Sequence, residues 1–214
     1  MKTVVIKVGG SLFDLPDLSA RLSRLLDEFE HAHPLLICGG GDAANLVRSW
    51  DQTFDLSEET AHWLAIQSLI LNDRLLCELL PDARIVSSRA EATEVWKEHK
   101  IPVLCSYTYL KQTSEAQIAP LPTSWDVTSD SIAAWVTLTW PAEELVLLKS
   151  VELLRENSLT ELAQVGLVDL HFPSFSESLP KLRWCNLRCK DEPAQLTTVI
   201  KGKSFHIRNA TGPA

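Results

Sequence analysis

The sequence predicts an α/β fold, with a mainly parallel open sheet covered by helices, as a single domain over residues 1–214. Three observations lead to this prediction. The order strand, glycine turn, helix occurs twice between residues 3 and 50, which indicates βαβ units. The runs at 3–8 and 144–149 are almost wholly aliphatic, as in strands buried on both faces. No linker, internal repeat or low-complexity tract divides the chain.

The first half of the chain alternates between short strands and amphipathic helices. We expect strands at 3–8, 34–38, 84–86 and 101–105. The helices between them start near Pro16-Asp17, Asp42, Ser57 and Ser88 and run to about His33, Trp50, Leu80 and His99. The third helix is apolar on most faces, so we expect it to be buried or to lie at a subunit contact.

The second half begins with a polar, proline-containing stretch at 106–128, which we expect to be a loop, with room for a short hairpin, that covers the site. A helix from Ser129 and a buried strand at 144–149 follow. Beyond them we expect a short helix capped by Ser158, a small strand at 167–168, loop or helix at 169–181, an edge strand at 182–189, a helix at 193–200 stopped by Gly202, and a last strand at 204–207.

Composition narrows the class of partner. The chain has a hydrophobic content of 45%, a charged content of 22% and a formal net charge of -8, which argues against nucleic acid or an anionic membrane as the main partner. No run approaches the ~20 apolar residues of a membrane span, and the first residues contain no signal-peptide core. The five cysteines are odd in number and lie mostly in apolar segments, so we expect reduced thiols in a cytoplasmic protein.

Four polar or glycine-rich segments follow predicted strands or open a predicted helix. In open parallel sheets, ligands bind outside the carboxyl ends of the strands, so we expect these segments to meet at one edge. Glycine allows close backbone approach to an anion, and a following helix N-terminus favours negative charge. The segments hold the candidates Lys7, Gly9, Gly10 and Ser11; Gly39, Gly40, Gly41 and Asp42; Thr128, Ser129 and Asp130; and Lys149 and Ser150.

Each segment also has a plainer interpretation. The glycine segments match neither the P-loop nor the dinucleotide-binding pattern and are common in ordinary turns. Asp130 is placed equally well to cap a helix as to organise lysines, hold a metal or accept a proton. Lys149 faces a phosphate or extends to the surface from a strand end. Cys185 and Cys189 fit no common zinc spacing with a histidine, so we expect no protein-held metal site, and Trp125 is a candidate to stack on an acceptor ring.

The segments KVGGS at 7–11, CGGGD at 38–42, DVTSDSIAA at 126–134 and ELVLLKSVE at 144–152 together resemble the amino acid kinase superfamily. That group includes carbamate, N-acetylglutamate, uridylate, isopentenyl phosphate and aspartate kinases. The resemblance covers residues 1 to about 152 and implies a three-layer αβα sandwich around an eight-stranded sheet. It also implies ATP and Mg²⁺ as cofactors, a small-molecule phosphate or carboxylate acceptor, and a homo-oligomer.

The resemblance also implies roles for the candidates. Lys7 would stabilise the transferring γ-phosphoryl group, and Asp130 would orient the catalytic lysines. ATP phosphates would be held by Lys7, Gly9, Gly10, Ser11, Lys149 and Ser150. The acceptor would be bound by Gly39, Gly40, Gly41, Asp42, Thr128 and Ser129.

The wording TSDSIAA resembles most the members whose acceptor is itself a phosphomonoester, such as uridylate kinase and the small kinase of methanofuran synthesis, which acts on an (aminomethyl)furan-methyl phosphate. The chain departs from the superfamily after Lys149, where an acidic-glycine turn is expected and Ser150-Val151-Glu152 stands instead. A second catalytic lysine is expected later in the chain, and Lys181 is one candidate. The alternative is therefore a non-catalytic member that binds a nucleotide or anion as a regulatory or storage subunit.

Overall fold

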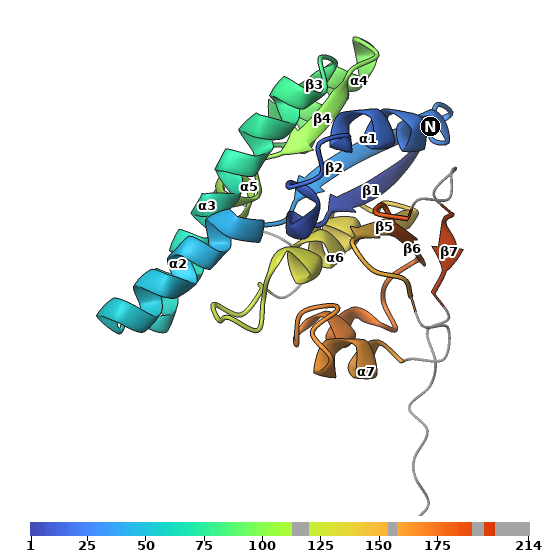
Figure 1. Ribbon diagram of the computed structural model, residues 1–214. Helices are drawn as coiled ribbons and strands as arrows, with labels where there is room; N and C mark the ends of the chain where they lie inside the picture. The colour runs from blue at the N-terminus through green and yellow to red at the C-terminus, as the bar shows by residue number, and fades with distance from the viewer. Residues whose placement is uncertain (113–119, 154–157, 190–194, 200–214) are drawn as a thin grey trace, which may run out of the picture.

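A computed structural model describes residues 1–112, 120–153, 158–189 and 195–199 of the chain. Seven strands in these residues form one sheet in the order β3-β4-β2-β1-β5-β6-β7, and every neighbouring pair is parallel except β6 with β7 (Figure 1). The strands are β1 (Lys2–Val8), β2 (Ala32–Cys38), β3 (Ala83–Val86), β4 (Ile101–Leu104), β5 (Glu144–Lys149), β6 (Lys181–Asn186) and β7 (Thr197–Thr198). The predicted α/β class with a mainly parallel sheet is confirmed.

Helices cover both faces of this sheet. They are α1 (Leu18–Asp27), α2 (Gly41–Phe54), α3 (Glu58–Leu79), α4 (Arg89–Lys97), α5 (Ser106–Gln112), α6 (Ser129–Thr139) and α7 (Leu159–Gln164), with short 3₁₀ turns η1 (Gly10–Leu12) and η2 (Phe172–Phe175). Figure 1 shows α2 and the first part of α3 side by side and extending away from the sheet, while the rest of α3 runs along the sheet towards β3. Among the described residues, no helix has the length and apolar character needed to cross a membrane.

The alternation of side chains along the strands assigns each residue to a face. Val5 and Leu147 pack into the same core cluster as the buried residues of α6, whereas Ile6 and Leu148 pack into the cluster that contains the buried leucines of α1. Successive strand residues point to opposite faces, so a residue two positions after Val5 or Leu147 lies on the α6 side. This alternation sends the last polar side chains of β1 and β5 towards the start of α6.

Two predicted boundaries in the first half differ from the structure. The helix expected to run to His33 ends at Asp27, because Ala32 to Pro34 pair with the start of β1 and extend β2 in that direction. The loop expected after residue 105 contains α5, in which Tyr109 is buried against the rings of Trp135 and Trp140 while the polar end of the helix is exposed. Burial of Tyr109 stabilises a helix in a segment whose polar composition predicts a loop.

The C-terminal part differs most from expectation. No strand forms at 167–168, and β6 is not the edge strand because β7 pairs with it in antiparallel orientation. The helix expected at 193–200 is wrong over its described part, where Leu196 and Val199 pack into the two opposite core clusters on either side of β7. The described residues contain seven strands rather than eight, and the strand expected at 204–207 lies outside them.

Candidate active site at the carboxyl edge of the sheet

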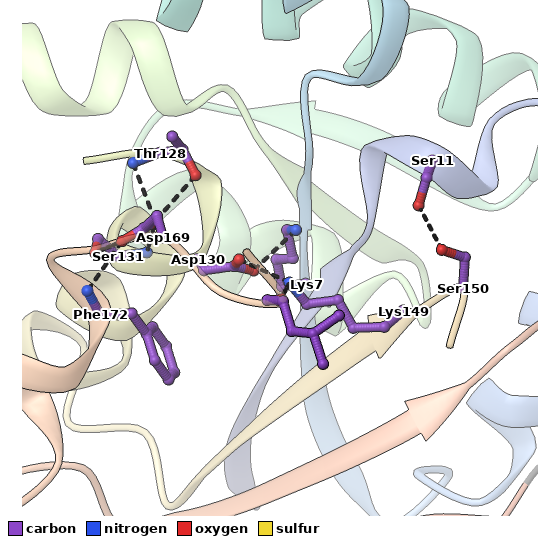
Figure 2. A network of polar contacts seen from close by, with 10 residues as sticks. Lys7, Ser11, Thr128, Asp130, Ser131, Lys149, Ser150, Asp169 and Phe172 are labelled. Atoms are coloured by element: carbon purple, nitrogen blue, oxygen red, sulfur yellow. Dashed lines mark hydrogen bonds and ion pairs between the residues drawn. The ribbon is translucent and has the colours of Figure 1, made fainter. Parts of the chain in front are cut away.

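A buried cluster of two lysines and one aspartate lies where β1, β5 and α6 meet. Lys7 Nζ is 2.9 Å from Asp130 Oδ1, and Lys149 Nζ donates to Asp130 Oδ2 at 2.7 Å (Figure 2). Lys7 and Asp130 are each 4% exposed, and Lys149 is 9% exposed. The two lysines reach Asp130 because both lie on the α6 side of their strands. Of the interpretations left open, the structure contradicts a surface position for Lys149 and places Asp130 between the lysines.

Burial and charge act against each other in this cluster. Burial alone would raise the pKa of Asp130, but Lys149 and Lys7 stabilise the carboxylate and hold its pKa at about 2. Burial lowers the pKa of Lys149 to about 8, which Asp130 opposes and Lys7 reinforces. The three groups carry a net charge of +1 while both lysines are protonated. The cluster therefore presents positive charge in a site that is largely shielded from water.

The two glycine turns pack directly against each other. A Cβ on Gly10 would lie 2.0 Å from the amide nitrogen of Gly41, and a Cβ on Gly41 would lie 2.4 Å from the carbonyl oxygen of Gly10. Gly41 also has a φ of +51°, a conformation that L side chains rarely adopt. A Cβ on Gly39 would lie 2.5 Å from Gly10 N. The contact between the turn after β1 and the turn after β2 therefore requires glycine at these positions. The same glycines also suit a bound anion.

Asn72 on α3 holds the second glycine turn from behind. Its Nδ2 donates to the carbonyl oxygens of Gly39 at 2.6 Å and Gly40 at 2.9 Å. Asn72 and Gly39 are buried, so the amide supplies a donor to a carbonyl that water reaches poorly. Asn72 is a site residue that the sequence does not reveal, because a single asparagine inside a long helix carries no signal of the turn it contacts.

A pocket of about 680 Å³ opens beside the lysine–aspartate cluster, between η1, α2, α3 and α6. It brings together most of the predicted site residues: Lys7, Gly10, Ser11, Gly40, Gly41, Asp42, Thr128, Ser129 and Asp130. Gly9, Gly39, Lys149 and Ser150 do not line it. Gly9 instead packs against β5, where a Cβ would lie 2.7 Å from Leu148 O. The pocket therefore unites the predicted acceptor segments with the end of β1.

The pocket is also lined by His62, Trp125 and Arg48. His62 Nδ1 is 2.9 Å from the carbonyl oxygen of Ser124, and because that oxygen only accepts, Nδ1 carries the proton. Burial lowers the pKa of His62, although the hydrogen bond to Ser124 opposes the shift, so the ring is neutral at pH 7 with Nε2 as an acceptor. Trp125 Nε1 donates to Asp51 Oδ2 at 2.8 Å, and Arg48 lies 5.2 Å from its ring centroid.

The η1 turn also contacts the segments that follow β5 and β6. Ser11 Oγ donates to Ser150 Oγ at 3.0 Å, so these two predicted residues are in contact (Figure 2). Arg188, which lines the pocket, donates to the carbonyl oxygen of Ser11 at 2.5 Å and pairs with Asp14. Lys181 is not a second site lysine, because it lies at the start of β6 and pairs with Glu144 at the other end of the sheet.

A parallel sheet whose carboxyl edge joins two buried lysines, one aspartate and two packed glycine turns beside a pocket defines an α/β protein with a positively charged site at that edge. The chain belongs to the Amino acid kinase family, whose profile matches residues 2–159. The resemblance drawn from the four sequence segments is confirmed.

Individual relatives agree with this assignment. The chain is 28% identical over 149 residues to the [5-(aminomethyl)furan-3-yl]methyl phosphate kinase of Methanocaldococcus jannaschii, an alignment that spans 69% of this chain and 66% of that protein. The fold is similar to uridylate kinase from Archaeoglobus fulgidus, with a TM-score of 0.58 and 20% identity over 86% of this chain and 90% of the other. It is also similar to UMP kinase from Ureaplasma parvum, with a TM-score of 0.60 and 12% identity over 86% and 88% of the two chains.

Proposed function

We propose that the protein is an ATP-dependent kinase that transfers a phosphoryl group to a small phosphomonoester. The observation that carries the proposal is the buried Lys7–Asp130–Lys149 cluster, whose first two members line the pocket beside both glycine turns. Phosphoryl transfer needs little covalent chemistry from the protein and depends on positioning and positive charge. A net charge of +1 in a water-poor site suits that requirement.

The geometry supports a division of labour among the predicted residues. Lys7 is the lysine of the cluster that lines the pocket, so it is the one placed to contact the transferred group. Asp130 pairs with both Lys7 and Lys149, so it is proposed to fix the direction of the two ammonium groups. Gly41 opens the 14-residue helix α2, whose N-terminus favours a negatively charged group, so the acceptor phosphate is proposed to bind there. ATP phosphates are proposed to bind on the side of η1 near Ser11 and Ser150.

Mg²⁺ is expected to arrive with the nucleotide. The described residues contain no group of three or more His, Cys, Asp or Glu side chains arranged to hold a metal ion. Mg²⁺ is commonly bound through substrate phosphates and water with few protein ligands, and this chain fits that mode. When bound, the ion would neutralise charge on the phosphates, while the lysines act from the protein side.

Two pocket residues, His62 and Trp125, support an acceptor with a ring and a hydrogen-bond donor. Neutral His62 offers Nε2 as an acceptor, which suits a hydroxyl or amino group. Trp125 presents an aromatic surface, although Arg48 occupies one side of its ring. The M. jannaschii relative is named for an aminomethyl-furan phosphate, which has these features, so we propose a heteroaromatic phosphomonoester of this kind.

A non-catalytic protein that binds a nucleotide remains the rival function, favoured by the absence of a glycine turn after Lys149. Release of ADP from MgATP, measured with [5-(aminomethyl)furan-3-yl]methyl phosphate, UMP, acetylglutamate and aspartate as acceptors, separates the two. The kinase proposal predicts turnover with a phosphomonoester and none with the carboxylates. Calorimetric binding of MgATP without ADP release from any acceptor would contradict it and support the rival.

A further inference from the structure

One carboxylate outside the lysine cluster collects five hydrogen bonds (Figure 2). Asp169 Oδ2 accepts from the backbone N–H and the hydroxyl of Thr128, both at 3.0 Å, and from the backbone N–H of Ser131 at 2.9 Å. Asp169 Oδ1 accepts from the Ser131 hydroxyl and from the backbone N–H of Phe172 at 2.9 Å. All five partners are donors, so both carboxylate oxygens of Asp169 accept hydrogen bonds from within the protein.

These bonds fix the beginning of α6. Thr128 is the N-cap of α6, but its own side chain makes no capping bond to the helix. Asp169 instead accepts from the N–H of Ser131, the position that an N-cap side chain usually satisfies. Asp130 lies between the two residues that Asp169 holds. The direction of the Asp130 side chain is therefore set by a residue 39 positions later in the chain.

The same segment also holds the lysine. The carbonyl oxygen of Leu167 accepts a hydrogen bond from Lys149 Nζ at 2.6 Å. Residues 167–169 thus hold both members of the Lys149–Asp130 pair. The Leu167 carbonyl binds Lys149 directly, and Asp169 holds the start of α6, where Asp130 lies. The family profile matches residues 2–159, and this segment lies beyond them. The role of the segment is therefore argued from its contacts in this chain.

We infer that Asp169 is a positioning residue for phosphoryl transfer, which sets the Lys7–Asp130–Lys149 geometry by clamping the N-terminus of α6 to the segment that binds Lys149. The inference rests on the proposed kinase function. Asp169 itself does not line the pocket, so its effect on the reaction is indirect. Small displacements of catalytic groups slow transfer strongly, and loosening α6 would move Asp130 relative to both lysines.

Lys149 offers a readout that does not depend on catalysis. The charged groups that face it are Asp130 on α6, Lys7 on β1 and Asp169 on the following segment, and the ring of Trp184 on β6 lies 5.5 Å from its Nζ. Burial lowers the Lys149 pKa to about 8, while Asp130 and Asp169 raise it and Lys7 lowers it. Removing the Asp169 charge must therefore lower the Lys149 pKa further, and loosening Asp130 acts in the same direction.

The test compares Asp169→Asn with Asp126→Asn, which makes the same change of charge at an exposed aspartate in the loop before α6. In Asp169→Asn one carboxylate oxygen becomes an NH₂ group that faces donors, so at least one backbone N–H loses its acceptor. We expect kcat to fall roughly tenfold or more with KM for ATP nearly unchanged. We expect the Lys149 pKa, followed by NMR of the lysine side chains, to fall below about 8. Asp126→Asn should change neither.

A folded Asp169→Asn protein with wild-type kcat and an unchanged Lys149 pKa would overturn the inference. If Asp169→Asn does not fold, Ser131→Ala removes one donor to Asp169 and keeps every charge. That variant is expected to lower kcat at least ~3-fold without changing KM, and an unchanged kcat would refute the inference. If the wild-type protein transfers no phosphate to any acceptor, the proposed function fails, while the Lys149 titration still decides whether Asp169 sets the cluster.

Discussion

Replacing Lys7 with methionine removes one positive charge from the site and keeps a side chain of similar length. The cluster then changes from a net charge of +1 to zero. Asp130 keeps its bond to Lys149 at 2.7 Å, so no buried carboxylate is left unpaired and the fold should persist. The variant therefore tests the function of the charge rather than the stability of the protein.

The expected size of the effect follows from electrostatics. A unit charge about 4 Å from a phosphoryl oxygen interacts with it by roughly 4 kcal/mol at an effective dielectric constant near 20. Removal of one such transition-state contact commonly costs about 3–4 kcal/mol, which corresponds to a fall in kcat of about 10²–10³. Lys7 is almost fully shielded from water, so this contact is not replaced by solvent.

The assay is ADP release from MgATP with the best phosphomonoester acceptor. Lys2→Met is the matched control, because Lys2 lies at the other end of β1 and forms an exposed pair with Glu143. We expect Lys2→Met to retain the wild-type kcat. In Lys7→Met the pKa of Lys149 should rise, because Lys7 lowers it in the wild type. A kcat for Lys7→Met within about threefold of the wild type would refute the role given to Lys7.

Four further predictions concern the turns and the pH dependence. Gly10→Ala should reduce the free energy of unfolding in urea by several kcal/mol, because its Cβ would meet backbone at 2.0 Å. Gly166→Ala is the control: Gly166 has φ +74° but open space around it, so this change should cost only about 1 kcal/mol. Equal losses in the two variants would contradict the packing argument. Asn72→Ala should cost about 1–3 kcal/mol in the same measurement, because the Gly39 carbonyl loses the donor that Asn72 supplies and the Gly40 carbonyl keeps only the bond from the Ala44 N–H at 3.4 Å. A loss within error would show that water replaces the amide. Asp130 has a folded pKa of about 2, below its usual 3.8, so Asp130 takes up its proton in the unfolded chain before it does so in the folded protein as the pH falls. The ionised carboxylate therefore stabilises the fold above about pH 3.8, and this stabilisation should be lost towards pH 2. Asp130→Asn should not show this loss. Lys149 has a pKa of about 8, so kcat/KM should decline above that pH, and a flat profile to pH 10 would exclude a role for its charge.

The part of the site that could be predicted from sequence is the part built from strand ends. Lys7 and Lys149 each stand two positions after an aliphatic residue of the same face, and parallel strands bring their carboxyl ends together. The contact of both with Asp130 follows once α6 covers that face. The glycine turns were predicted for a different reason than the structure gives, because their packing against each other depends on the β1–β2 register.

The remaining site residues could not be predicted, because their roles arise from contacts between distant segments. Asp169 meets Thr128 and Ser131 across 41 and 38 residues, and Arg188 reaches Ser11 across 177. No local pattern encodes such contacts. The same holds for α5 and β7, where burial of a few apolar side chains overrides a polar or helix-like composition.

Phosphorus NMR of the reaction products tests the proposed kinase function most directly. The protein, MgATP and [5-(aminomethyl)furan-3-yl]methyl phosphate are incubated together, with UMP in a parallel reaction. We expect a new pair of coupled diphosphate resonances on one of the two acceptors, with ADP formed in equal amount and no signal from Lys7→Met. Unchanged acceptors, or ATP converted only to ADP and inorganic phosphate, would contradict phosphoryl transfer to a phosphomonoester.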